Sequence, residues 1–355
     1  MPSHSQPIIS AQELGFRWSA IDPFLFCVHH DDRYPRANEG LGPDASLAGR
    51  DIGQDFAGKD GWRMYHGSTV PGFPAHPHRG FETVTIVRKG LIDHSDSLGA
   101  TARFGGGDVQ WLTAGRGIVH SEMFPLLQRD QENRLELFQI WLNLPASHKM
   151  VEPHFKMFWS EQVPHHPFRD SAGALTVVTS IAGRVRGATG REAPPPPPDS
   201  WASQQQADVA IWTLAMEPGA RWTLPAANGK GVRRCLYFFE GQSLTIGGQR
   251  VDRHGALELA CDRDIDLING ALPAQMLMLQ GKPIAEPVAQ YGPFVMNTQA
   301  EIQQAFADYQ SSHFGGWPWP DQAPVHGKEP RRFATHPDGR CERLQMQSPQ
   351  TTSQE

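Results

Sequence analysis

Short apolar runs, separated by turns that contain glycine or aspartate, fill the chain from residue 73 to residue 141. The runs read ETVTIV, ATARF, DVQWL, GIVHSEMF and LELFQIWLNL. Their lengths and their content of β-branched and aromatic residues are typical of strands, and none of them keeps the 3.6-residue repeat of a helix. This part of the chain therefore predicts a β-rich domain.

The same apolar pattern returns in the second half of the chain. Strand candidates there are ALTVVTSIAG, DVAIWTLAM, RCLYFFEG, QSLTIGG, HGALELA and AQMLMLQG. Between the two blocks, residues 143–170 are rich in proline and histidine, which is typical of a connection between domains. We therefore predict two all-β domains, the first over residues 1–160 and the second over residues 161–330.

One segment near the C-terminus has the pattern of a helix. Thr298 and Glu301 have the spacing of a capping box, in which each side chain bonds the backbone N–H of the other residue. Apolar residues then recur at helical spacing on one face: Ile302, Ala305, Phe306 and Tyr309. A short helix that belongs to the second domain is therefore expected over about 299–311.

Two segments are expected to lie outside the regular elements. The run Pro194–Pro198 favours an extended polyproline conformation and cannot join a central strand, so it predicts an exposed loop. A role for this loop in docking a protein partner is the lesser alternative. Residues 331–355 form a polar tail that is expected to be disordered.

The composition limits the class of protein. With 39% hydrophobic and 20% charged residues, the chain suits a globular protein in solution. A net charge of −6 without any basic run disfavours direct binding to nucleic acid or to an acidic membrane. There is no apolar run of about 18 residues and no signal-peptide pattern at the N-terminus. The four cysteines form no CxxC pair, so we expect free thiols and a cytoplasmic protein.

Two residue pairs in the first half have the spacing of metal ligands. His76 and His78 are two positions apart, as are His120 and Glu122, and alternate side chains of a strand share one face. Two such strands in one barrel would offer three nitrogens and one carboxylate oxygen. This donor set suits a first-row divalent metal, with Fe(II) as the natural candidate for oxygen chemistry, although Mn, Ni, Cu or Zn would also fit.

Each part of this pattern has a simpler explanation. A single HxH pair in a strand is more often exposed or hydrogen-bonded than ligating, and it is the combination of HxH with HxE that favours a metal. Glu82 could be a fifth ligand, a residue that holds an imidazole, or a surface residue. Four other histidines lack a partner at ligand spacing and are left out of the site: His66, His94, His165 and His166.

The second half lacks the same pattern. The turn-rich stretch from Glu217 to Pro225, where a second site would offer histidines, contains no HxH pair. The histidine that follows it, His254, stands alone. We therefore expect no metal in the second domain.

Four segments resemble the pirin family of the cupin superfamily. They are HPHRGFETVT from His76, HSDSLG from His94, GDVQWLTAGRGIVHSE from Gly107 and GPFVMNT from Gly292. The resemblance implies a bicupin, with two antiparallel β-barrels of jelly-roll type and one divalent metal ion, usually iron, in the first barrel only. The family's ligand pattern falls on His76, His78, His120 and Glu122.

The resemblance also implies an activity. Some pirins are similar to quercetin 2,3-dioxygenases, which open the central ring of a flavonol with O2. On this hypothesis the chain binds a small aromatic, flavonol-like substrate and O2 near the metal. Glu122 is then the candidate catalytic residue, because its carboxylate would accept the hydroxyl proton. Phe73, Phe81 and Trp111 are candidate walls for a flat substrate, and core packing is the alternative for each.

Two other functions stay open. Family members are also known as metal- or redox-dependent regulators that bind a transcription factor or a metabolic enzyme, and a storage cupin with an idle site is the third possibility. The ligand set does not separate these functions. Turnover of flavonols with O2 uptake would favour the enzyme, whereas partner binding without turnover would favour the regulator. We expect a monomer in each case.

Overall fold

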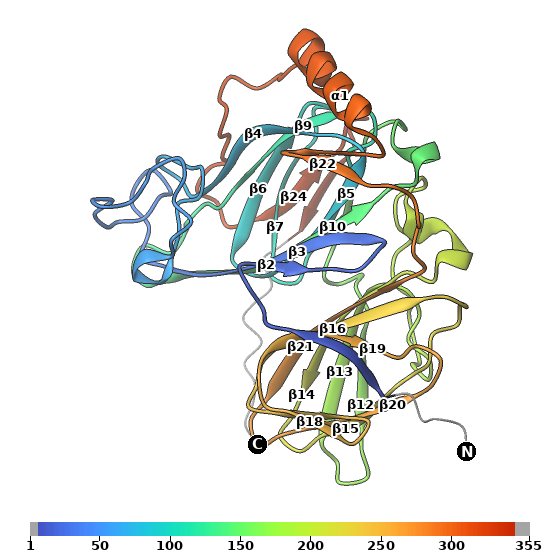
Figure 1. The fold of residues 1–355 in the computed structure, drawn as a ribbon. Helices are drawn as coiled ribbons and strands as arrows, with labels where there is room; N and C mark the ends of the chain where they lie inside the picture. The colour runs from blue at the N-terminus through green and yellow to red at the C-terminus, as the bar shows by residue number, and fades with distance from the viewer. Residues whose placement is uncertain (1–5, 345–355) are drawn as a thin grey trace. The chain divides into compact units, whose positions relative to one another are not determined.

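A computed structural model describes residues 6–344 of the chain. The residues divide into two compact units. Unit I consists of residues 29–139, 149–157 and 287 onward, and unit II consists of residues up to 28, 140–148 and 158–286. Both are built almost entirely of strands, as the apolar runs predict (Figure 1). Among the described residues, no helix has the length and apolar character needed to cross a membrane.

Unit I contains two antiparallel sheets, with strand orders β11-β8-β5-β10-β3 and β25-β24-β7-β6-β9-β4. The first sheet is built from β3 (Phe24–Tyr34), β5 (Phe81–Lys89), β8 (Val109–Thr113), β10 (Asn133–Asn143) and β11 (His154–Phe158). The second is built from β4 (Gly72–His78), β6 (Leu91–Asp96), β7 (Thr101–Gly105), β9 (Ile118–Met123), β24 (Arg332–Thr335) and β25 (Cys341–Leu344). Apolar side chains such as Phe81, Val84 and Trp111 are fully buried here.

Unit II contains a seven-stranded sheet, β1-β19-β16-β21-β14-β13-β12, and a four-stranded sheet, β15-β20-β17-β18. The larger sheet is built from β1 (Ile8–Gln12), β12 (His165–Arg169), β13 (Leu175–Ala182), β14 (Ala210–Met216), β16 (Arg233–Glu240), β19 (Gly255–Leu259) and β21 (Ala274–Gly281). The smaller is built from β15 (Arg221–Leu224), β17 (Leu244–Ile246), β18 (Gln249–Val251) and β20 (Ile265–Asn269). A short strand, β2 (Arg17–Ser19), pairs with β3. Trp212, Leu236 and Met278 belong to the apolar core of this unit.

The two units interleave along the chain, whereas the sequence predicted one boundary near residue 160. The physical reason is long-range strand pairing. Strand β1 pairs antiparallel with β19, so the first strand of the chain belongs to unit II. Residues 287 onward return to unit I. The Pro194–Pro198 run has no regular secondary structure, with Pro195 exposed and Pro197 buried.

The predicted C-terminal helix is present as α1 (Gln299–Ser312), but it groups with unit I and not, as predicted, with the second domain. Its capping box forms as expected, because the Thr298 hydroxyl accepts from the Glu301 N–H at 3.2 Å and the Glu301 carboxylate accepts from the Thr298 N–H at 2.7 Å. Ile302 and Ala305 pack with Phe294 of the neighbouring hairpin, which consists of β22 (Ala289–Tyr291) and β23 (Phe294–Met296). The helix lies outside the strands of unit I (Figure 1).

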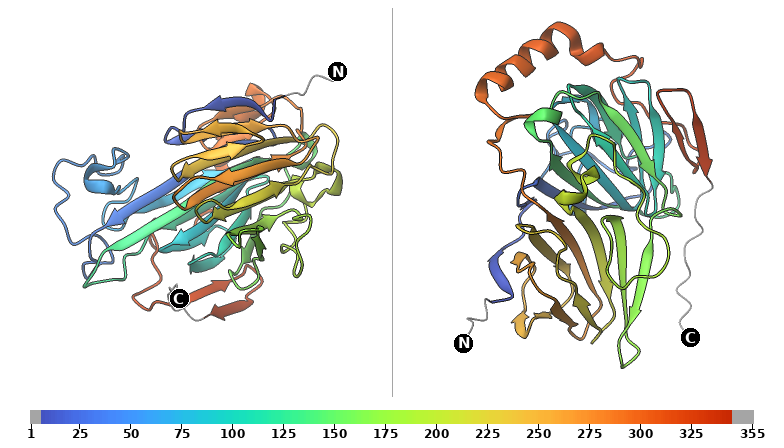
Figure 2. Two further views of the ribbon diagram at one scale, coloured as in Figure 1. Left: turned by 90° about the horizontal axis from the view of Figure 1, so that it is seen from below. Right: turned by 90° about the vertical axis from the view of Figure 1, so that its right-hand side faces the viewer.

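The expectation of a disordered tail was wrong for residues 332–344. These residues form the hairpin β24–β25, and β24 pairs with β7 at the edge of the unit I sheet (Figure 2). A buried ion pair of 2.6 Å joins Arg332 to Asp108, and the Arg103 guanidinium donates to the carbonyl oxygens of Gly327 and Glu329. Specific pairs between polar residues thus hold this segment in place. The polar composition of the segment predicted disorder because composition does not show such pairs. Residues 345–355 lie outside the described part of the chain.

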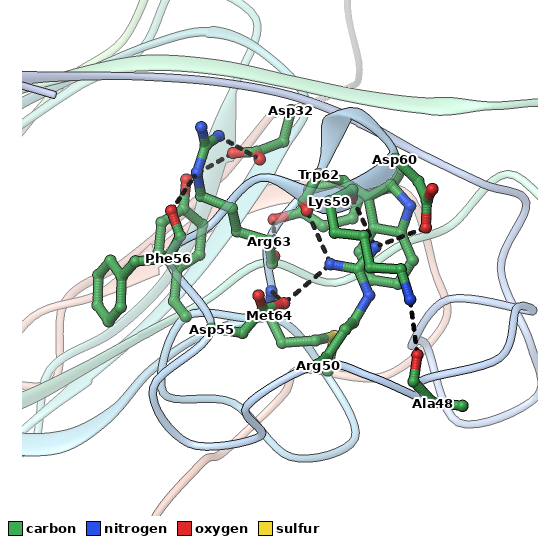
Figure 3. Close-up of polar contacts among 12 residues, drawn as sticks. Asp32, Ala48, Arg50, Asp55, Phe56, Lys59, Asp60, Trp62, Arg63 and Met64 are labelled. Carbon is green, nitrogen blue, oxygen red and sulfur yellow. Dashed lines mark hydrogen bonds and ion pairs between the residues drawn. The ribbon is translucent and has the colours of Figure 1, made fainter.

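A long connection between β3 and β4, residues 35–71, is ordered by one buried arginine (Figure 3). The Arg50 side chain is fully buried and forms an ion pair with Asp55 at 2.9 Å. It also donates to the carbonyl oxygens of Trp62 and Lys59, at 2.9 and 2.7 Å. The guanidinium carbon lies 3.3 Å from the centre of the Trp62 ring. These contacts join residues 50–62 in a connection that has isolated β-bridges, such as Asp55 with Tyr65, but no strand.

Candidate metal centre

Strands β4 and β9 bring the predicted ligand pairs together. In their antiparallel register His76 lies directly opposite His120, and a bulge between Phe73 and His76 adjusts the alignment. Directly opposite residues of an antiparallel pair share one face, and His78 is on the same face as His76 because it is two positions further along. The ligand atoms of the three histidines all lie within 4.8 Å of one another. Three histidines at this spacing could hold a metal ion.

Hydrogen bonds orient two of the three imidazoles. The Nδ1 atom of His76 lies 2.8 Å from the carbonyl oxygen of Pro74, and Nδ1 of His78 lies 3.3 Å from that of Pro293. A carbonyl oxygen only accepts, so each Nδ1 carries the hydrogen and each Nε2 keeps its lone pair for a metal. His120 is fully buried, and neither of its ring nitrogens has a partner among the described residues. These orphaned atoms fit a bound ion.

The histidines are held in the neutral form that binds a metal. Burial lowers the pKa of His76 to about 4. Burial also lowers the pKa of His78 and His120 well below the ordinary value, and the neighbouring imidazoles add to this effect. Metal ions therefore do not have to compete with a proton for these nitrogens near neutral pH.

Glu122 lies two positions from His120 on β9, and its carboxylate has other partners. Its carboxylate accepts from the Gln139 amide at 2.7 Å and from the Thr85 hydroxyl at 3.4 Å. Burial raises the pKa of this carboxyl group. The carboxylate oxygens are not part of the group of atoms within 4.8 Å, so Glu122 as the fourth ligand stays a prediction.

The family is shown by comparison with known proteins. Residues 10–142 match the pirin family model, and residues 211–315 match the model of the pirin C-terminal cupin domain. The chain belongs to the pirin family. The predicted bicupin fold is therefore confirmed, with a short C-terminal helix added to its strands.

Several relatives of this pirin carry the name of an enzyme. A protein of Pseudomonas aeruginosa named "Putative quercetin 2,3-dioxygenase" is 35% identical over 68% of this chain and 79% of its own length. Human pirin is 33% identical over 71% of this chain and 80% of its own length. The crystal structure of a quercetin 2,3-dioxygenase from Acinetobacter baumannii is 25% identical, with a TM-score of 0.64 over 87% of this chain and 96% of that one.

Glu82 is a buried residue of this pirin, so the alternative of a surface residue was wrong. Its side chain is fully buried and accepts from the Thr113 hydroxyl at 2.7 Å. The two residues lie directly opposite each other on β5 and β8. Glu82 is not among the three residues whose ligand atoms gather.

Sequence reasoning missed His94, which is fully buried beside the centre. It lies opposite Glu122 in the register of β6 and β9, and its ring centre is 5.6 Å from that of His120. The sequence does contain one sign of this residue, since Asp96 follows it two positions along the same strand. In the structure Nε2 of His94 lies 3.0 Å from the Asp96 carboxylate. Of the other histidines left out, His66 is exposed and His165 and His166 belong to β12 of unit II.

Aromatic rings lie close to two of the three histidines. The half-buried Phe73 ring lies 6.3 Å from the His76 ring, and the buried Phe81 ring lies 5.1 Å from that of His78. The rings of Tyr65 and Phe124 lie within 6.0 Å of Phe73. Tyr65 comes from the connection in which Arg50 is buried. No spacing pattern in the sequence predicts that its ring lies near Phe73.

Unit II offers no comparable centre. The stretch from Glu217 to Pro225 forms β15 without a histidine, and the described residues contain one group of potential ligands, which lies in unit I. His254 is exposed, and its Nε2 lies 2.9 Å from the carbonyl oxygen of Gly241.

Replacing His254 with alanine should leave metal content unchanged, because this imidazole has no second ligand beside it. Elemental analysis of the purified variant checks this expectation, and circular dichroism checks the fold. Loss of metal from a folded His254→Ala protein would show that unit II holds an ion.

Proposed function

We propose that this pirin holds one divalent metal ion, Fe(II) in the native protein, and cleaves a flavonol or a related enol with O2. The observation that carries the proposal is the convergence of three neutral imidazoles on one face of the β4–β9 pair. The names of the Pseudomonas and Acinetobacter relatives support the reaction class. When bound, the iron would supply the Lewis acidity and the redox chemistry that O2 requires.

The side chains then have separate roles. His76, His78 and His120 hold the ion through one nitrogen each, with Glu122 as the fourth ligand. The Glu122 carboxylate accepts the proton of the substrate hydroxyl, and its raised pKa brings it closer to that of a general base at neutral pH. The Gln139 amide and the Thr85 hydroxyl keep the carboxylate in place.

The aromatic residues beside the histidines suit a flat substrate. Phe73 is only half-buried, so one part of its ring stays available for contact with a ligand. Phe81 and Trp111 are fully buried, and core packing is the role that burial supports for both. Of the three candidate walls, Phe73 is therefore the one we propose to stack against the substrate.

The deciding experiment is anaerobic metal analysis of the protein, followed by measurement of O2 uptake over a series of flavonols and related enols. Iron with flavonol-dependent O2 uptake supports the dioxygenase. Bound iron without O2 uptake in the presence of any of these compounds would instead favour the regulatory alternative. In that case a protein partner binds according to the oxidation state of the metal.

The protein should bind one metal ion per chain. The three histidines form the single group of potential ligands within the described residues, and unit II lacks the pattern. Elemental analysis after removal of loosely bound metal measures the ratio. Two tightly bound ions per chain, with one retained after His76→Ala, would contradict the single-site arrangement.

A further inference from the structure

Two neighbouring buried histidines have ring nitrogens without partners. His94 and His120 are both fully buried. Neither nitrogen of His120 has a hydrogen-bond partner among the described residues, and the same is true of Nδ1 of His94. Buried polar atoms without partners are rare in folded proteins, and each one requires an explanation.

The strand register places these two rings on one face of the sheet. In the pairing of β6 with β9, His94 lies opposite Glu122 and Asp96 lies opposite His120. The side chains of directly opposite residues point to the same side of an antiparallel pair. His94 and Asp96 therefore share the face that carries His120 and Glu122.

Asp96 determines which nitrogen of His94 carries the hydrogen. One carboxylate oxygen of Asp96 accepts the backbone N–H groups of Leu98 and Ala100, at 2.9 and 3.0 Å. The other oxygen lies 3.0 Å from Nε2 of His94. An ionised carboxylate only accepts, so Nε2 donates and Nδ1 of His94 keeps a free lone pair. Stacking on Phe155, with ring centres 5.2 Å apart, fixes the plane of this imidazole.

Binding of a metal ion to His120 would turn the unpartnered atoms of His120 and His94 into a donor and an acceptor for each other. A metal takes one nitrogen of His120, and the other nitrogen then carries a hydrogen that requires an acceptor. Nδ1 of His94 is an acceptor without a partner, on a ring whose centre is 5.6 Å from that of His120. Two imidazoles joined by a hydrogen bond of about 3 Å have ring centres roughly 5 Å apart, so a small rotation closes the contact.

We propose that His94 is a positioning residue for the ligand His120. Its Nδ1 accepts the hydrogen bond from the N–H group of His120 that does not bind the metal. Asp96, His94 and His120 thus form a chain that fixes the orientation of the third ligand, as Pro74 and Pro293 do for His76 and His78. This inference rests on the proposed metal centre and deepens it.

The test compares the binding of Zn²⁺ alone by the wild type and two variants, in competition with a chelator. Asp96→Asn keeps the oxygen that accepts from Leu98 and Ala100, but its amide donates to Nε2 and so moves the hydrogen of His94 to Nδ1. His94→Gln can keep a donor toward Asp96, but it has no ring nitrogen to accept at the position of Nδ1. Both should weaken Zn²⁺ binding by about 10- to 100-fold, the usual effect of losing such a partner.

His336→Gln is the matched control. His336 is also a buried histidine paired with a carboxylate, at 2.7 Å from Glu342, and its ring also contacts Phe155. Its contacts among the described residues do not include His120. This variant should bind Zn²⁺ as tightly as the wild type. The thermal midpoints of the metal-free Asp96→Asn and wild-type proteins should agree, because the exchange is isosteric.

A spectroscopic measurement separates positioning from a general loss of structure. In Zn²⁺-loaded protein with ¹⁵N-labelled histidine, NMR should show the hydrogen of His94 on Nε2 in the wild type and on Nδ1 in Asp96→Asn. Unchanged Zn²⁺ affinity of a folded Asp96→Asn protein, or a wild-type His94 with its hydrogen on Nδ1, would overturn the inference. If the wild type itself does not bind Zn²⁺, the proposed metal centre fails as well, so the two failures are distinguishable.

Discussion

The His120→Ala variant should lose bound metal and flavonol turnover together. His120 supplies one of the three imidazoles that converge, and the three ring centres lie within 4.9 Å of one another. The loss leaves two imidazoles and a carboxylate that is held by Gln139 and Thr85. Metal content should fall to about a tenth or less, and O2 uptake should fall in proportion, since structural partners of a metal ligand alone already change affinity 10- to 100-fold.

Elemental analysis and an O2 electrode measure the two quantities on the same preparation. His254→Ala is the matched control, because it also removes one imidazole but from a histidine without a second ligand. Circular dichroism of both variants tests the fold. A folded His120→Ala protein that keeps a full complement of metal would show that the three-histidine group is not the binding site.

The Glu122→Gln variant should keep metal and lose turnover. The amide is nearly isosteric and keeps an oxygen that can accept from Gln139, but it has neither the charge nor the basicity of the carboxylate. The three histidines still hold the ion, so a substantial fraction of the metal should remain. Turnover of flavonols should fall by about 10²-fold or more, which is the usual size of a lost general base.

Glu82→Gln is the matched control for this prediction. Glu82 is another buried glutamate of unit I, it is hydrogen-bonded to Thr113, and it lies outside the ligand group. Its variant should keep both metal and most of the turnover. If Glu122→Gln turns over flavonols at the wild-type rate with metal bound, Glu122 is not the base, and the proposed proton transfer fails while the fold and the metal centre stand.

The parts of this structure that depend on local pattern could be predicted from the sequence. Strands follow from short apolar runs, α1 follows from its capping box and apolar stripe, and the shared face of His76 and His78 follows from their two-residue spacing on one strand. The physical basis in each case is a repeat or a contact within a few residues.

The parts that depend on distant pairing could not be predicted. Strand β1 pairs with β19, which begins about 240 residues later, and β24 pairs with β7, with a buried ion pair between Arg332 and Asp108. The spacing of His94 to Asp96 on one strand does not reveal what lies opposite it, and only the register of β6 and β9 places His94 beside Glu122. The spacing of residues along the chain does not predict which strands become neighbours in a sheet.

The hydrogen bond between His78 and Pro293 has a consequence for the order of events during synthesis. The two residues are 215 positions apart, and all of residues 158–286, the main part of unit II, lie between them in the chain. The ribosome therefore delivers the ligand strands early and the carbonyl group that orients His78 late. Unit II is synthesised before the carbonyl group that orients His78, so stable uptake of the proposed metal ion would come at the end of translation or after release.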